Sequence, residues 1–379
     1  MGCSTLQQRR PAGFSLVEMM IATLLGMLLV AWLTQLLLDT TRLNREMSNT
    51  SALAERGRLA LQLLRQDLRH AGYWHTYQPQ YDDPGWTQVP GDVPALVPDP
   101  CLGIENWPED RTSGYIQALL GIAVQSSDAA PGEHCQALLS AERGEPGTDV
   151  LVVRHAATCL VGLGICAPAE AGEVAFQASN CASELAAGAR YSLAPGVSPL
   201  TERDCITPAF RHQLVQNIYF IRNTERGEPA LYRSRLGVSA GAPGQLRAQE
   251  IVPGVERFRV MLGIDSVGAS GSVVDYGSPL VWQDPTVQRV PVNRGDGVPD
   301  GAFIHCSEVT PCARSQLVNV TAVRLYLLVR AREESAGYRN DQSYDLGGLV
   351  VGPFDDSYKR DVFTATVLLR NIAVRRERG

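Results

Sequence analysis

The stretch of sequence that decides the fold is residues 14–38, FSLVEMMIATLLGMLLVAWLTQLLL, in which Glu18 is the one charged residue. As an α-helix this stretch is about 37 Å long, and the hydrocarbon core of a bilayer is about 30 Å thick. Two arginines precede the stretch and Asp39 follows it. Because basic residues favour the cytoplasmic side, we expect one membrane span with the N-terminus in the cytoplasm and the rest of the chain outside.

A short basic leader ends at Gly13, directly before Phe14 and the apolar stretch. An ordinary secretory signal has an apolar region of about 7 to 15 residues and then a small-residue cleavage site. Here the apolar run is longer, and no such site follows it. A plain signal anchor is one alternative, but an anchor has no use for the carboxylate of Glu18. A charge at the centre of a membrane helix costs about 2.5 to 3.5 kcal/mol, so this carboxylate is expected to have a partner.

The run Gly13, Phe14, Ser15–Val17, Glu18 resembles the type III signal of type IV prepilins. The resemblance implies that a prepilin peptidase cuts after Gly13 and methylates the new N-terminal Phe14. It also implies that Glu18 neutralises the N-terminal ammonium of a neighbouring subunit as helices pack into a filament. A Glu18 that snorkels to the membrane interface without a partner is the alternative.

The apolar helix is predicted to continue outward as an amphipathic helix. Residues 39–71 contain no proline and one glycine, Gly57. Their apolar residues recur at spacings of three, four or multiples of these, which places them on one helix face. Gly72 follows as the predicted C-cap. The apolar positions are Leu43, Met47, Leu53, Ala60, Leu64, Leu68 and Ala71.

The remainder of the chain predicts a β-rich domain with long loops. Of the 379 residues, 45% are apolar, only 7% are aromatic, and glycine (35) and proline (23) are plentiful. This composition suits a loop-rich β domain better than a helical bundle. Seven prolines between positions 75 and 111 predict an extended loop, and the Gly-, Ser- and Asp-rich residues 267–300 predict a second one. Strands are predicted at 149–155, 213–222, 230–234, 254–264, 318–330 and 362–374.

Together these patterns predict an α+β fold, and the resemblance to type IV prepilins implies that it is pilin-like. A long N-terminal helix, with a membrane half and an amphipathic half, packs on an antiparallel β-sheet-rich C-terminal domain. The expected organisation is a cleaved cytoplasmic leader at 1–13, a long helix at 14–72 whose residues 14–38 cross the membrane, and a periplasmic globular domain at 73–379. The closing residues 375–378 are expected to form a solvated tail.

The cysteines predict an oxidising compartment. Of nine cysteines, eight follow the apolar segment, and an even number of exported cysteines is typical of disulfides. A zinc site is the alternative, but the sequence has no Cys-x-x-Cys and no histidine pair at ligand spacing. Any of 105 connectivities is possible. Pairing of sequence neighbours is the preferred hypothesis: Cys101 with Cys135, Cys159 with Cys166, Cys181 with Cys205, and Cys306 with Cys312.

A loop at 293–301 resembles short calcium-binding loops. It contains Asn293, Asp296 and Asp300 among glycines, and calcium takes oxygen ligands from carboxylates and carbonyls. The loop lacks the acid series and terminal glutamate of an EF-hand. A plain Gly/Asp turn is the alternative reading, and no other cofactor is expected.

Several segments resemble PilW-type minor pilins of type IV pili, in the order of that family. They are residues 41–44, 61–73, 147–154, 219–221, 231–233, 254–258, 322–330 and 362–371. The resemblance implies a subunit that primes pilus assembly and lies near the tip. The implied partners are other minor pilins, the major pilin, the prepilin peptidase, the inner-membrane assembly platform and a large tip adhesin.

Other functional classes find less support in the sequence. A J-type pseudopilin of type II secretion and a membrane-anchored periplasmic adhesin or binding module are the alternatives. Gly-x-Ser-x-Gly, His-Glu-x-x-His and phosphate-binding glycine loops are absent, and the six histidines are scattered, so an enzyme is not expected. The formal net charge of −6 argues against a nucleic-acid partner.

Overall fold

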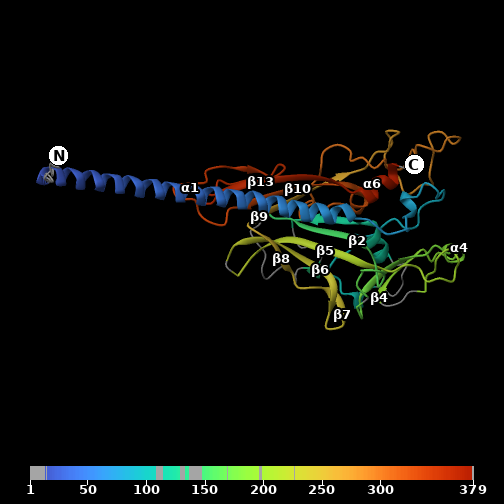
Figure 1. Ribbon diagram of the computed structural model, residues 1–379. Coiled ribbons are helices and arrows are strands. Elements are labelled where there is room, and N and C mark those ends of the chain that lie inside the picture. The colour runs from blue at the N-terminus through green and yellow to red at the C-terminus, as the bar shows by residue number, and fades with distance from the viewer. Residues whose placement is uncertain are drawn as a thin grey trace, which may run out of the picture. The chain divides into compact units, whose positions relative to one another are not determined.

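The computed structural model describes residues 13, 15–107, 114–128, 133–135, 147–168, 170–195, 199–225 and 227–377. The chain divides into two compact units, Met1–Ala52 and Leu53–Gly379. The helix α1 (Leu16–His70) begins in the first unit and ends in the second (Figure 1). The second unit therefore includes the last turns of the helix, and not only the residues from 73 onward that the sequence assigns to the globular domain.

In the first unit, α1 is the main described element and its apolar side chains are exposed. By length and composition this helix could cross a membrane. The hydroxyl groups of Thr34 and Thr40 each donate to the carbonyl oxygen four residues earlier, at 2.7 Å. Their polar atoms are therefore satisfied within the helix, as a lipid environment requires.

In the second unit, one face of α1 is buried. The buried residues repeat at helical spacing: Leu53, Gly57, Ala60, Leu61, Leu64 and Leu68. Leu43 and Met47, which the sequence assigns to the same stripe, are exposed. A Cβ atom added to Gly57 would lie 2.3 Å from the Phe363 ring, so this glycine allows the helix and a strand to approach closely. The helix ends at His70, and the φ of +72° at Gly72 is the left-handed conformation that a C-capping glycine adopts.

The larger sheet has eight antiparallel strands. Its main path runs β1-β2-β5-β3-β4, and β6 pairs with β5, β7 and β8. The strands are β1 (Val124–Ser127), β2 (Val150–Leu160), β3 (Val174–Ala178), β4 (Tyr191–Pro195), β5 (His212–Asn223), β6 (Pro229–Ser239), β7 (Ala242–Gln245) and β8 (Gln249–Pro253).

The smaller sheet has the order β13-β10-β9. Its strands are β9 (Val255–Ile264), β10 (Val320–Arg330) and β13 (Arg360–Leu368), and β11 (Tyr344–Asp345) pairs separately with β12 (Val350–Val351). One hydrophobic cluster contains residues of α1 together with residues of both sheets, so the helix is part of the core (Figure 1). The short helices are η1 (Gln80–Asp82), η2 (Ile104–Asn106), α2 (Gly114–Gly121), α4 (Ala182–Ala186), α5 (Arg314–Leu317) and α6 (Arg370–Glu377).

The predicted α+β class is confirmed, and each of the six predicted strands overlaps an observed one. As far as their residues are described, the two predicted loops are irregular apart from the 3-10 turns η1 and η2 and isolated bridges. The prediction for 362–374 is wrong after Leu368, because α6 follows. Residues Leu369, Ile372, Ala373 and Arg376 are buried, at the spacing i, i+3, i+4 and i+7 of one helix face. The expected solvated tail is also wrong for Arg376, which is only 6% exposed.

Candidate functional site

The predicted processing signal lies at the start of α1. Gly13 has no atom of the protein within 4 Å of the position that a Cβ would take. Phe14, which the sequence predicts as the methylated residue, lies outside the described residues, as do residues 1–12. The Oε2 atom of Glu18 accepts a hydrogen bond from the Ser15 amide at 2.9 Å. Glu18 therefore caps the first turn of its own helix, where a negative charge also complements the helix dipole.

The membrane half of α1 presents apolar side chains on all sides. None of its most apolar 18-residue window is buried in the protein. Leu16 is 78% exposed, Met27 74% and Trp32 67%. A helix that is apolar all round is stable only in lipid or against other apolar helices. This surface therefore needs a partner outside the chain, either a bilayer or the helices of other subunits.

A polar network fixes the second half of α1 to the larger sheet. The Asp67 carboxylate accepts from Asn217 Nδ2 at 3.0 Å and from the Tyr219 hydroxyl at 2.9 Å, and it lies 3.1 Å from His155 Nε2. The other ring nitrogen of His155 lies 2.8 Å from the Ala156 carbonyl oxygen. The Asp67 carboxylate and both ring nitrogens of His155 face partners, so we interpret the cluster as an anchor for the helix. No local sequence pattern marks Asp67 or its partners as an anchor.

The C-terminal helix α6 caps the end of α1. Asn371 Nδ2 donates to the carbonyl oxygens of Arg69 and Ala71, at 3.0 and 3.2 Å. Arg375 Nη1 donates to the Gly72 carbonyl at 2.9 Å. The last carbonyl groups of a helix have no partner within the helix itself, and here the C-terminus of the chain provides donors near that end. The position of α1 in the second unit therefore depends on residues 300 positions later in the chain.

A buried ion cluster holds α6 in place. Arg376 Nε donates to Asp82 at 2.9 Å, and Arg376 Nη1 donates to Asp265 at 3.0 Å. Its third nitrogen donates to the Val318 carbonyl at 3.1 Å. Burial raises the pKa of the Asp265 carboxyl, and the positive charge of Arg376 acts in the opposite direction. One guanidinium thus joins the proline-rich loop, the end of β9 and the C-terminal helix.

The predicted calcium loop packs around this cluster. The amides of Asp296 and Gly297 donate to the Asp265 carboxylate, at 3.2 and 2.9 Å. The Asp300 carboxylate accepts from two backbone amides of residues 266–267, at 2.8 and 2.7 Å, and Asn293 Oδ1 accepts from another amide at 3.0 Å. The three predicted ligands thus already serve the loop itself, as a Gly/Asp turn requires. Calcium binding at Asn293, Asp296 and Asp300 stays a prediction.

The eight cysteines that follow the apolar segment form four disulfides in the structure. The pairs are Cys101–Cys135, Cys159–Cys166, Cys181–Cys205 and Cys306–Cys312. These are the sequence-neighbour pairs of the preferred hypothesis. Their Cα atoms are 4.9 to 5.7 Å apart, within the range of ordinary disulfides. The sequence separation within a pair ranges from 6 to 34, so the bridges close loops of very different length.

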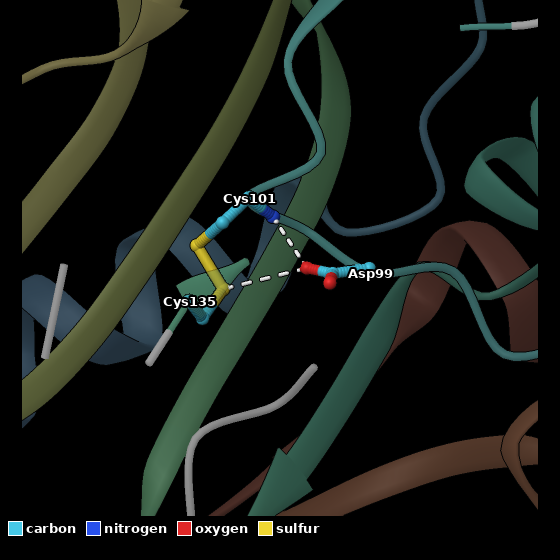
Figure 2. Close-up of side chains that lie close together, drawn as sticks. All are labelled: Asp99, Cys101 and Cys135. Carbon is cyan, nitrogen blue, oxygen red and sulfur yellow. Dashed lines mark hydrogen bonds between the residues drawn. A yellow bond between two sulfur atoms is a disulfide. The ribbon is translucent and has the colours of Figure 1, made fainter. Parts of the chain in front are cut away.

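Among the described residues, one group of three side chains has the composition of a metal site: Asp99, Cys101 and Cys135 (Figure 2). Asp99 Oδ1 accepts from the Cys101 amide at 2.9 Å and lies 3.7 Å from the sulfur of Cys135. Figure 2 shows the two sulfur atoms joined to each other. A bridged sulfur has neither a thiol proton to donate nor a thiolate to bind a metal. Asp99 therefore acts as a local anchor of the bridged loop.

The loop lengths predict unequal contributions of the disulfides to stability. Replacing Cys101 and Cys135 by serine frees a loop of separation 34, whereas Cys159 and Cys166 close one of separation 7. Loop-closure entropy then predicts a loss of about 4 kcal/mol for the first pair and about 2 kcal/mol for the second. Urea unfolding of the two double variants, each in the full chain, measures which variant loses more free energy of unfolding. Equal losses, or several free thiols in the denatured, unreduced wild type, would contradict it.

Two protein families match parts of the chain. Residues 218–371 match the family described as Type IV Pilus-assembly protein W, and residues 8–34 match the Prokaryotic N-terminal methylation motif. No curated protein and no solved structure matches the chain. The first match runs from β5 to the start of α6 and includes the Cys306–Cys312 disulfide. The second match contains Gly13, Phe14 and Glu18.

Proposed function

We propose that this chain, a PilW-type minor pilin by its two family matches, primes the assembly of a type IV pilus and lies at or near the pilus tip. The observation that carries the proposal is the apolar half of α1, which overlaps the methylation motif at residues 8–34 and whose side chains are not buried in the protein. Such a helix can be exchanged between lipid and a helical filament core, because both are apolar. The PilW-family region assigns the filament to type IV pili.

The proposal carries specific expectations for location and partners. Before assembly the chain spans the inner membrane once, with its disulfide-bonded unit in the periplasm, where disulfides form and persist. After cleavage by the prepilin peptidase, it passes through the inner-membrane assembly platform into the fibre. There it contacts the major pilin, other minor pilins and a large tip adhesin. The PilW family is a structural one, so we assign no catalytic residue.

Deletion and complementation test the proposed priming role. A strain without the chain is expected to lose most surface pili and twitching motility while retaining the major pilin in its membrane. Restoring the wild-type chain should restore both. A chain that only binds a ligand in the periplasm would leave pilus number unchanged on deletion. A J-type pseudopilin would instead be identified by lost protein secretion with normal pili.

Processing at Gly13 is a separate prediction. Replacing Gly13 by valine is expected to leave the full-length precursor in the membrane, because a branched side chain does not fit where the peptidase needs a small residue. Gly26, the next glycine along the helix, offers the control: Gly26→Ala should be processed normally. Mass spectrometry of the membrane-extracted chain is the measurement. A methylated N-terminus at Phe14 in the Gly13→Val variant would show that the glycine is not required.

A further inference from the structure

The strand β1 leaves one edge of the larger sheet open. It pairs with β2 in the register Val124↔Val153 to Ser127↔Val150, and no second strand pairs with it among the described residues. The Ala123 carbonyl, one position before the strand, accepts from the Arg154 amide at 2.8 Å. Because pairing alternates along an antiparallel ladder, Gln125 and Ser127 turn their backbone groups toward β2. The N–H and C=O of Ser126 therefore point away from β2, toward the open edge.

A cavity of about 280 Å³ lies along this edge. Gln125, Ser126 and Ser127 of β1 form one wall, and residues 97–99 of the proline-rich loop form another. The Cys306–Cys312 disulfide loop and Leu317 complete the lining. No backbone hydrogen bond joins residues 97–99 to β1 within the described part of the chain. The cavity thus lies between β1 and residues 97–99 of the proline-rich loop.

Two polar atoms in this wall are buried without a partner. Gln125 Oε1 and Ser126 Oγ make no hydrogen bond, although their residues are only 4% and 7% exposed. A buried acceptor without a donor costs roughly 1 to 3 kcal/mol, so such groups are rare in native proteins. Neighbouring residues of a strand point to opposite faces of the sheet. A cavity lined by three consecutive residues of β1 therefore lies along the edge of the strand.

We propose that this edge binds an extended segment of another filament subunit, which adds a strand beside β1. The N–H and C=O of Ser126 supply main-chain hydrogen bonds to the incoming segment. The apolar walls, Val97 and Leu317, receive small aliphatic side chains. Strand addition of this kind takes its affinity from the backbone and its specificity from the side-chain pockets. The choice of a filament subunit as partner rests on the proposed function.

The direction of the Ser126 amide gives a selective test. A proline at 126 removes the outward N–H but leaves the pairing of β1 with β2 intact, because edge strands accept proline where the N–H faces away from the sheet. The matched control, Ser126→Ala, keeps this N–H. A photoreactive p-benzoylphenylalanine at Val97, at the rim of the cavity, reports the partner in intact cells that produce the full-length chain. The same probe at exposed Val350 serves as a position outside the cavity.

Val97 is expected to cross-link to another filament subunit, and Val350 is not. Ser126→Pro should reduce the yield of the cross-link roughly tenfold, because one main-chain hydrogen bond is lost and its partner stays unpaired. Ser126→Ala should reduce this yield by less than about threefold. No cross-link at Val97, an equal cross-link in Ser126→Pro, or a cross-link within the same chain would each overturn the proposal. Membrane abundance and disulfide content of the variants confirm folding.

Hydrogen exchange of the wild type gives a second test that needs no variant. The amide of Ser126 should exchange at least tenfold more slowly in purified filaments than in the detergent-extracted chain, because strand addition buries it. Equal exchange in both would overturn the proposal. If the chain is absent from filaments, the proposed function itself fails. Normal recovery in filaments without protection of Ser126 rejects only the strand addition.

Discussion

Replacing Arg376 by methionine is expected to lower the free energy of unfolding of the globular unit by about 3 to 5 kcal/mol. The guanidinium is 98% buried at the side chain and donates to Asp82, Asp265 and the Val318 carbonyl. Methionine fills a similar volume but donates no hydrogen bond. Asp265, whose side chain is 0% exposed, then loses its cation, whereas Asp82, at 1% exposed, still lies 3.1 Å from Arg375 Nη2. A buried charge without its partner is among the most destabilising defects in a protein.

Urea unfolding of the full chain in detergent, followed by tryptophan fluorescence, measures this loss. Arg370→Met is the matched control, because Arg370 belongs to the same helix and is exposed. It should change the free energy of unfolding by less than about 0.5 kcal/mol. Adding Asp265→Asn to Arg376→Met should recover part of the stability, since one uncompensated charge is removed. Equal stability of Arg376→Met and Arg370→Met would contradict this account of the cluster.

The same variant should show a changed dependence on pH. Burial raises the pKa of Asp265 in the folded protein, and Arg376 limits that rise. A carboxyl whose folded pKa exceeds its unfolded pKa destabilises the fold as pH rises from the unfolded value, about 4, through the folded value. Without Arg376 this penalty grows. The difference in stability between wild type and Arg376→Met should therefore be smaller near pH 4 than at pH 7.

Local patterns predicted the helix and the long strands of this fold. The amphipathic stripe from Leu53 to Leu68 and the alternation along residues 323–327 are signals within one element, and both elements form where they were expected. The short edge strands were missed, because four-residue strands such as β1 and β7 are too short to establish a period. The strand predicted at 362–374 extends too far beyond the end of β13. The reason is that β13 and α6 follow each other closely, so their apolar residues form one continuous segment in the sequence.

The residues that anchor α1 could not be recognised from sequence alone. Asp67 meets Asn217 and Tyr219 across 150 and 152 positions, and Arg376 meets Asp82 across 294. Nothing local distinguishes these acids from the solvated ones nearby. In the sequence, the charged run at 375–378 looks like an exposed tail. Only the apolar residues Ile372 and Ala373, which are buried in the structure, could have indicated a helix face there. The methylation motif that matches residues 8–34 was predictable because each of its parts lies in one short stretch.

Removing the charge of Glu18 is expected to block entry into filaments without preventing insertion into the membrane. Glu18→Gln and Glu18→Ala should both be inserted, cleaved after Gly13 and disulfide-bonded like the wild type. Their recovery in sheared filaments should fall at least tenfold relative to their abundance in the membrane. If Glu18 neutralises the ammonium of Phe14 in a neighbouring subunit, either change leaves that ammonium unpaired among apolar helices, at a cost of several kcal/mol.

The structure also gives Glu18 a local role that these two variants separate. Its carboxylate accepts from the Ser15 amide, and a loss of helix capping could by itself disturb the first turn. Glutamine keeps an acceptor oxygen for that amide but has no charge, whereas alanine has neither. Equal defects in both variants therefore assign the assembly role to the charge. Thr34→Val serves as a control in the same helix, because the Thr34 hydroxyl bonds only to the carbonyl of its own turn. Recovery of Glu18→Gln at the wild-type level, with a defect in Glu18→Ala alone, would mean that Glu18 caps the helix and that the charge pair does not set the register of the filament.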